Sequence, residues 1–133
     1  MKINPYLNFN GNCAEAFTYY EKVLGGKIEM SSTFGAMPAE YPCPPGWKDK
    51  ILHISMSVGG DTLMGSDAPP DHYGKPDGFS VSLQIPEPAE ATRVFEALSS
   101  GGSVQMPIQK TFWAKLFGMC VDKFGVPWMI NCQ

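Results

Sequence analysis

An internal repeat restricts the fold of this sequence more than any other feature. Residues 14–16 (Ala-Glu-Ala) return about 75 residues later as residues 89–91, and a pair of glycines follows each copy, at residues 25–26 and 101–102. The apolar residues in between fall at helical spacing in both copies. The sequence therefore predicts that one helix-containing unit occurs twice.

A second echo follows each predicted helix. Residues 60–64 (Gly-Asp-Thr-Leu-Met) return as residues 125–129 (Gly-Val-Pro-Trp-Met), this time after 65 residues. The shorter offset predicts an insertion in the first copy, and the Pro-rich segment 37–47 is its natural position. We expect a single domain made of two units, residues 1–67 and 79–133, joined by a Pro/Gly-rich linker at residues 68–78.

The composition is typical of a globular protein. Of the 133 residues, 44% are apolar and 17% are charged, and the formal net charge is −3. There is no run of about 18 apolar residues to span a membrane, no recognisable export signal and no basic stripe to bind a phosphate backbone. We therefore expect a cytoplasmic protein that binds neither nucleic acid nor membrane.

The cysteines lack the spacing of a metal site. Cys13, Cys43, Cys120 and Cys132 form no close pair, whereas structural zinc sites use pairs two to four residues apart. Disulfides are also not expected in the cytoplasm. We interpret the cysteines as reduced packing residues, since a nucleophilic Cys120 would need a base beside it.

The first half is predicted to contain a strand, a helix and three more strands. Apolar and polar residues alternate from Ile3 to Phe9, which indicates a strand. Asn12 and Glu15 have the spacing of a capping box for a helix that ends at the first glycine pair. Further strands are expected at residues 27–34, 51–58 and 62–66, with a loop over residues 35–49.

The second half repeats this order. Residues 79–85 alternate as a strand, and Pro88 suits the first turn of the following helix. The buried stripe of that helix is expected to contain Ala91, Val94, Phe95 and Leu98. Three strands are then expected at residues 103–108, 116–121 and 127–131.

The sheet faces that the helices leave uncovered carry uncharged polar side chains. The alternation places on them Tyr6, Asn8, His53, Ser55, Ser80, Ser82 and Gln84, together with Met64 and Met129. A sheet face exposed to water is the simpler alternative, but such a face usually carries charged residues. We therefore predict an α+β fold whose tandem βαβββ units form a curled mixed sheet around a cleft.

Five segments are similar to one known family. Residues 5–12 (PYLNFNGN), 33–38 (TFGAMP), 66–67 (SD), 111–114 (TFWA) and 121–131 (VDKFGVPWMIN) resemble the PhnB branch of the vicinal oxygen chelate superfamily. That superfamily includes glyoxalase I, extradiol dioxygenases, fosfomycin-resistance transferases and bleomycin-binding proteins. The resemblance implies a glyoxalase-like fold. Some members of the branch carry a methyltransferase label, but this chain has no Gly-rich loop for a methyl donor.

Metal-using members of that superfamily place His or Glu ligands on the first and last strands of each unit. The matching positions here are Asn4, Ser80, Met64 and Met129. Amide, hydroxyl and thioether groups are poor ligands for zinc, iron, nickel or manganese. A shift of the first strand by one residue would place Pro5 there, which is no ligand either. We therefore expect no catalytic metal and no cofactor.

Five residues either have two interpretations or are expected outside the cleft. His53 is the candidate catalytic or ligand-binding residue, because histidine titrates near neutral pH, but a packed histidine is the alternative. Phe112 and Trp113 are expected either to cap the cleft or to stack between subunits. His72 lies in the linker and is expected to be a solvated loop residue, and Trp128 is expected in the core.

The leading prediction is a homodimer that binds a small organic molecule in the cleft without a metal. The polar contacts are Tyr6, Asn8, His53, Ser80, Ser82 and Gln84, and the apolar walls are Met64, Phe112, Trp113 and Met129. The resemblance implies the dimer, because sheets of this superfamily commonly complete their clefts across a subunit pair. The alternatives are a metal-dependent glyoxalase-like isomerase, lyase or transferase that uses His53, and a structural dimer with a filled cleft.

Overall fold

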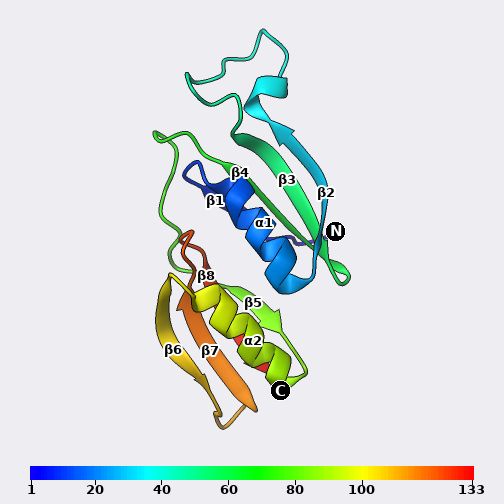
Figure 1. Cartoon of the computed structure of the whole chain (residues 1–133), viewed down its shortest axis with the longest axis vertical. Coiled ribbons are helices and arrows are strands. Elements are labelled where there is room, and N and C mark those ends of the chain that lie inside the picture. The colour runs from blue at the N-terminus through cyan, green and yellow to red at the C-terminus, as the bar shows by residue number, and fades with distance from the viewer. The chain divides into compact units, whose positions relative to one another are not determined.

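The computed structural model describes all residues from 1 to 133 and contains two compact units. Unit 1 is Met1–Gly74 and unit 2 is Lys75–Gln133. Each unit has one helix and one four-stranded mixed sheet, in the order strand, helix, three strands (Figure 1). The fold is therefore α+β and consists of tandem βαβββ units, as the sequence predicts.

Unit 1 has the strand order β1-β4-β3-β2. Its elements are β1 (Tyr6–Phe9), α1 (Cys13–Leu24), β2 (Lys27–Thr33), a 3-10 turn η1 (Phe34–Ala36), β3 (Ile51–Val58) and β4 (Asp61–Asp67). The first strand begins later than the alternation predicts. Leu7 and Phe9 are buried as expected, but Ile3 is 92% exposed, because only the chain from Pro5 onward pairs with β4.

Unit 2 repeats this topology with the order β5-β8-β7-β6. Its elements are β5 (Val81–Gln84), α2 (Pro88–Ser99), β6 (Ser103–Gln109), β7 (Leu116–Val121) and β8 (Pro127–Cys132). In both units the first strand lies parallel to the last, and the other pairs are antiparallel. Phe79, expected in the first strand of this unit, precedes β5 and is 52% exposed.

Each helix buries one stripe against its own sheet. The stripe of α2 is the predicted one, Ala91, Val94, Phe95 and Leu98, and α1 buries Cys13, Ala16, Phe17, Tyr20 and Val23. Trp128 is fully buried, as expected of a core residue. Each helix has 12 residues, and neither is long and apolar enough to cross a membrane.

The predicted capping box of α1 is wrong. Asn12 makes no side-chain cap hydrogen bond. Instead Cys13 N donates to Asp67 Oδ1 at 3.0 Å, and Ile51 N donates to Asp67 Oδ2 at 2.9 Å. The buried carboxylate at the end of β4 therefore satisfies the start of α1 and of β3 together, because an ionised acceptor binds a helix N-terminus better than an amide does.

Candidate binding site

In each unit one face of the sheet lies away from the helix, and we call it the distal face. A Cβ atom added at Gly65 would lie 2.7 Å from Phe17 of α1, so Gly65 and its partners Leu7 and Ile54 face the helix. Gly118 of unit 2 faces Phe95 of α2 in the same way. Alternation along each strand then places the intervening side chains on the distal face.

Two predicted site residues of unit 1 meet on its distal face. The hydroxyl of Tyr6 on β1 and Nδ1 of His53 on β3 are 3.0 Å apart. Their rings are stacked, with centroids 5.6 Å apart and planes at 23°. Because β4 lies between these strands, the pair reaches across β4, where Met64 is the partner of Tyr6. The contact occupies Nδ1 and leaves Nε2 of His53 available to a ligand.

The distal face of unit 2 carries Ser80, Ser82 and Gln84 on one edge. Ser82 is the partner of Met129 on β8, and Met129 is in turn the partner of Met119 on β7. Ser82 and Gln84 are exposed, whereas Ser80 and both methionines are half-buried. A row of one hydroxyl and two thioethers therefore crosses three neighbouring strands.

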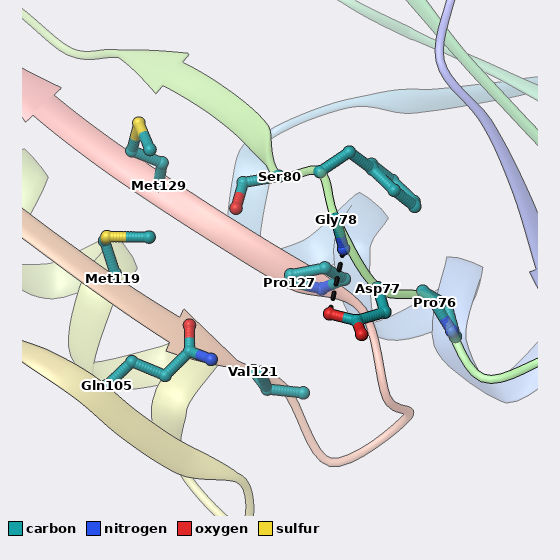
Figure 2. A pocket seen from close by; sticks show the side chains of 10 residues that line it. Pro76, Asp77, Gly78, Ser80, Gln105, Met119, Val121, Pro127 and Met129 are labelled. Carbon is teal, nitrogen blue, oxygen red and sulfur yellow. Dashed lines mark hydrogen bonds between the residues drawn. The ribbon is translucent and has the colours of Figure 1, made fainter.

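A hollow of about 420 Å³ opens on this face of unit 2. Figure 2 shows Met119 and Met129 beside one another on neighbouring strands, with Ser80 and Gln105 on either side of them. The lining consists of Pro76, Asp77, Gly78, Phe79, Ser80, Gln105, Met119, Val121, Pro127 and Met129. Its one charged side chain is Asp77, whose Oδ1 accepts a hydrogen bond from Gly78 N at 2.9 Å. The lining of the hollow therefore mixes polar and apolar side chains and carries no positive charge.

Phe112 and Trp113 lie in the connection between β6 and β7, and neither lines this hollow. Their rings are edge-to-face at 4.8 Å, and Trp113 also contacts Phe117 at 5.3 Å. Thr111 holds the turn, because its N donates to Ala114 O and its Oγ1 accepts from Ala114 N, both at 3.1 Å. Phe112 is 97% exposed.

The structure thus distributes the predicted site residues over three places. Tyr6, His53 and Met64 lie together in unit 1, where Asn8 is an exposed neighbour on β1. Ser80, Ser82, Gln84 and Met129 lie on the distal face of unit 2. Phe112 and Trp113 form a separate aromatic pair, and His72 is an exposed loop residue.

Sequence reasoning missed three residues of unit 2 that share this face. Met119 could have been found from the alternation of β7, where it is opposite in phase to the buried Cys120. Gln105 was hidden by an irregularity between Val104 and Met106 that changes the phase of β6. The third, Asn131, donates from Nδ2 to Gln84 Oε1 at 2.8 Å.

The residues at the positions of a possible metal site do not fit a divalent transition metal. Ser80, Met64 and Met129 offer a hydroxyl and two thioethers, and Asn4 precedes the first strand. No three His, Cys, Asp or Glu side chains lie together anywhere in the chain. Divalent zinc, iron, nickel and manganese prefer imidazole, carboxylate or thiolate ligands.

The buried thiols are not poised as nucleophiles. Burial and the nearby Asp122 raise the pKa of Cys120 to about 11. Burial, with a smaller contribution from Asp67, raises the pKa of Cys13 even further above its usual range. Both side chains are therefore neutral thiols near pH 7, and the thiolate is the reactive form.

This chain is similar to known proteins over nearly its whole length. The model of the Glyoxalase/Bleomycin resistance protein/Dioxygenase superfamily matches residues 2–130. Protein YjdN of Escherichia coli K12 is 39% identical, over 98% of this chain and 95% of that protein.

Two solved structures share the fold over the whole chain. Protein PA1353 from Pseudomonas aeruginosa is 51% identical with a TM-score of 0.92, covering 100% of this chain and 98% of that one. A putative 3-demethylubiquinone-9 3-methyltransferase, PhnB protein, from Bacillus cereus is 24% identical with a TM-score of 0.84, covering 100% of both chains.

Proposed function

The chain belongs to the Glyoxalase/Bleomycin resistance protein/Dioxygenase superfamily, and we propose that it binds a small organic molecule without a catalytic metal. The observation that carries this proposal is the hollow of about 420 Å³ on the distal face of unit 2. Concave sites lined by apolar groups and a few polar groups are typical of small-molecule binding. Thioethers supply adaptable apolar contacts there, and hydroxyl and amide groups supply orientation.

We assign the roles according to position. Met119 and Met129 form the apolar floor, and Ser80 and Gln105 supply hydrogen bonds within the hollow. Ser82 and Gln84 supply hydrogen bonds from the same face of β5, where Ser82 is the partner of Met129. The distal face of unit 1, with Tyr6, Asn8, His53 and Met64, is a second candidate binding surface in its own right. The hydrogen bond between Tyr6 and His53 supports this role, because it holds the imidazole in one orientation.

We further propose that the protein is a cytoplasmic homodimer and that Phe112 and Trp113 take part in the site or in the subunit contact. Phe112 is 97% exposed and lies against Trp113, which is 46% exposed, and adjoining exposed apolar side chains are a feature of contact surfaces. Light scattering after size-exclusion chromatography would measure the mass in solution. A monomer at micromolar concentration would contradict the dimer.

The methyltransferase name of the Bacillus cereus protein is not extended to this chain. The turns that lead from β1 to α1 and from β5 to α2 are residues 10–12 and 85–87, and they contain a single glycine, Gly11. Nucleotide-binding turns at this position use several glycines to bring the backbone close to the ligand. The short turns therefore offer no cradle for a methyl donor.

A thermal-shift screen of neutral, cationic and anionic small molecules tests the proposal. We expect at least one class to raise the unfolding midpoint, and Met129→Glu to abolish that rise by placing a charge in the hollow. The control is Ser31→Ala, an exposed strand position in unit 1. A complete lack of stabilisation across the screen would contradict the binding function.

A second candidate function is proton transfer by His53, and the Tyr6 contact favours it. A base whose orientation is fixed by a partner is a common feature of enzymes. In this reading His53→Gln would remove turnover of a bound ligand while leaving its affinity nearly unchanged. Metal analysis of protein purified without chelators separates this from a metal-dependent isomerase, lyase or transferase, for which about one equivalent per chain is expected.

A further inference from the structure

Three polar side chains form a directed chain of hydrogen bonds on the distal face of unit 2. Asn131 Nδ2 donates to Gln84 Oε1 at 2.8 Å, and Gln84 Nε2 donates to Ser82 Oγ at 3.0 Å. Gln84 and Asn131 are register partners on β5 and β8, and Ser82 precedes Gln84 on the same face. The three residues therefore form a relay that starts at a buried amide and ends at an exposed hydroxyl.

The donor-to-acceptor direction of this relay follows from its buried end, Asn131. Asn131 Oδ1 is buried and has no hydrogen-bond partner. Reversing every bond would place an amide nitrogen with two hydrogens at that buried position, and two unpaired donors cost more than one unpaired acceptor. Asn131 therefore donates outward, and Gln84 donates outward in turn.

The polarity decides what Ser82 can do. A serine hydroxyl has a single hydrogen. Gln84 occupies one of the two lone pairs of Ser82 Oγ and leaves the O–H free, so the hydroxyl can donate to a ligand. Ser82 is also the register partner of Met129, which lines the hollow. The relay therefore presents an O–H donor at the edge of an apolar floor made by Met119 and Met129.

Charge narrows the ligand further. Asp77 is the single charged side chain that lines the hollow. Lys75 lines the neighbouring hollow, but Asp77 lines that one as well. A phosphonate or carboxylate ligand would thus meet a carboxylate without a cation opposite it in the hollow itself. Anions bind in proteins where Arg, Lys or a helix N-terminus faces them.

We propose that Ser82, oriented by Gln84 and Asn131, donates a hydrogen bond to the ligand, and that the ligand class is an uncharged molecule with an apolar part and a carbonyl-type acceptor oxygen. The apolar part lies over Met119 and Met129, and the acceptor oxygen lies at Ser82. Ser82 contacts the ligand, whereas Gln84 and Asn131 are positioning residues. This inference rests on the proposed binding function and deepens it.

The test uses three probes that differ in one group. They are 2-acetonaphthone, which is neutral with a carbonyl, 2-ethylnaphthalene, which lacks the acceptor, and 2-naphthoate, which is anionic. Methyl signals of ¹³C-labelled methionine report binding, and Met119 and Met129 identify the place. We expect the ketone to bind about tenfold more tightly than the hydrocarbon, which is the upper end of the net gain from one hydrogen bond.

Variants then assign that gain to the relay. Ser82→Ala should remove the tenfold advantage of the ketone and leave hydrocarbon binding unchanged, while Ser82→Thr should keep the advantage. Gln84→Leu should reduce it, because the Ser82 hydroxyl is then free to turn and accept. Ser31→Ala on β2 is the matched control, since it removes an exposed strand hydroxyl from the other unit.

The outcomes separate this inference from the proposed function. Equal affinity for the ketone and the hydrocarbon in the unmodified protein would overturn the donor role, and tighter binding of naphthoate would overturn the uncharged ligand class, while binding itself stands. An advantage for the ketone that survives Ser82→Ala would also overturn it. If none of the probes shifts the Met119 and Met129 signals at millimolar concentration, both this inference and binding in the hollow fail.

Discussion

The two units have the same topology, yet their distal faces differ. Unit 1 places a phenol and an imidazole together, in the pair Tyr6 and His53. Unit 2 places thioethers, hydroxyls and amides around a hollow. The faces toward the helices are alike, since both helices pack a phenylalanine onto a strand glycine. Packing therefore constrains the repeated core, whereas the distal faces are free to differ in chemistry.

The glycine pairs after the two helices show how strictly packing constrains the structure that the two units share. Gly25 and Gly101 have φ angles of 67° and 76°, the left-handed conformation that ends a helix. The glycine that follows approaches the backbone of a strand in each unit. A Cβ atom at Gly26 would lie 2.9 Å from Ser57 O, and one at Gly102 would lie 2.1 Å from Val121 O.

Substitution of the second glycine of each pair tests how closely the two units correspond. Gly102→Ala should lower the free energy of unfolding by about 4 kcal/mol, because the backbone of β7 must move, whereas Gly26→Ala should lower it by about 1–2 kcal/mol. Urea unfolding followed by circular dichroism measures both. Gly60→Ala is the control, since nothing lies within 4 Å of its added Cβ atom. Equal losses at the two positions would show that β7 yields as easily as β3.

The second prediction compares the two buried carboxylates. Asp122 accepts from Phe124 N, Val126 N and Trp128 Nε1, all in its own hairpin. Asp67 instead connects the start of α1 to the start of β3. Replacement by Ala leaves buried donors unpaired, so we expect losses of about 3 kcal/mol for Asp122→Ala and about 2 kcal/mol for Asp67→Ala.

Hydrogen exchange distinguishes these two variants beyond their stability. Asp67→Ala should speed exchange in the first turn of α1, because Cys13 N loses its acceptor. Asp122→Ala should speed exchange at Phe124 and Val126 and leave α1 unchanged. Faster exchange in α1 for the Asp122 variant would contradict the local role assigned to that carboxylate.

The third prediction concerns the thiol that each unit buries near its carboxylate. Unfolding returns Cys13 and Cys120 to the usual thiol pKa, while folding holds both pKa values higher. The unfolded state therefore loses these protons first, and stability falls as the pH rises above about 8.5, by up to about 1.4 kcal/mol per pH unit for each thiol. For Cys120 this fall continues toward pH 11, near its folded pKa of about 11.

Variants and labelling check the assignment. Cys120→Ala should flatten the decline of stability between pH 8.5 and about 10 relative to the unmodified protein. Cys43 is half-buried, while Cys13, Cys120 and Cys132 are buried. A thiol reagent at pH 8 should therefore label one cysteine of the native chain quickly and all four after denaturation. Fast labelling of Cys120 in the native state would contradict the raised pKa.

Local spacing predicted the elements well, because helices and paired strands depend on residues close in the sequence. The buried stripe of α2, the alternation of β3 and the left-handed glycine after α1 all follow from short-range patterns. The cap of α1 could not be found in this way. Asn12 has the local signal, but its acceptor role belongs to Asp67, which is near only after β4 has paired.

Prediction of the candidate site from sequence was limited for the same reason, because its contacts depend on which strands pair. Alternation placed Ser82 and Gln84 on one face, but the hydrogen bond from Asn131 depends on the parallel pairing of β5 with β8. The contact of Tyr6 with His53 depends on β4 lying between their strands. Gln105 was missed because an irregularity in β6 shifts its phase. Composition of a face is readable from sequence, whereas its contacts need the strand order.

Tyr6→Phe should change the free energy of unfolding by less than about 1 kcal/mol, since Tyr6 is 42% exposed and its ring can remain stacked. Its effect on His53 should still be clear. Proton transfer through Nε2 of His53 needs a free lone pair on that nitrogen, so we expect Nδ1–H to donate to the phenol oxygen. Nitrogen-15 spectra of histidine should then show the Nδ1–H tautomer in the unmodified protein and a mixture in Tyr6→Phe. Ser82→Ala should leave the tautomer unchanged, because the relay of unit 2 does not include His53. An unchanged tautomer in Tyr6→Phe would show that the phenol does not orient His53, and the distal face of unit 1 would then lose its claim to acid–base chemistry.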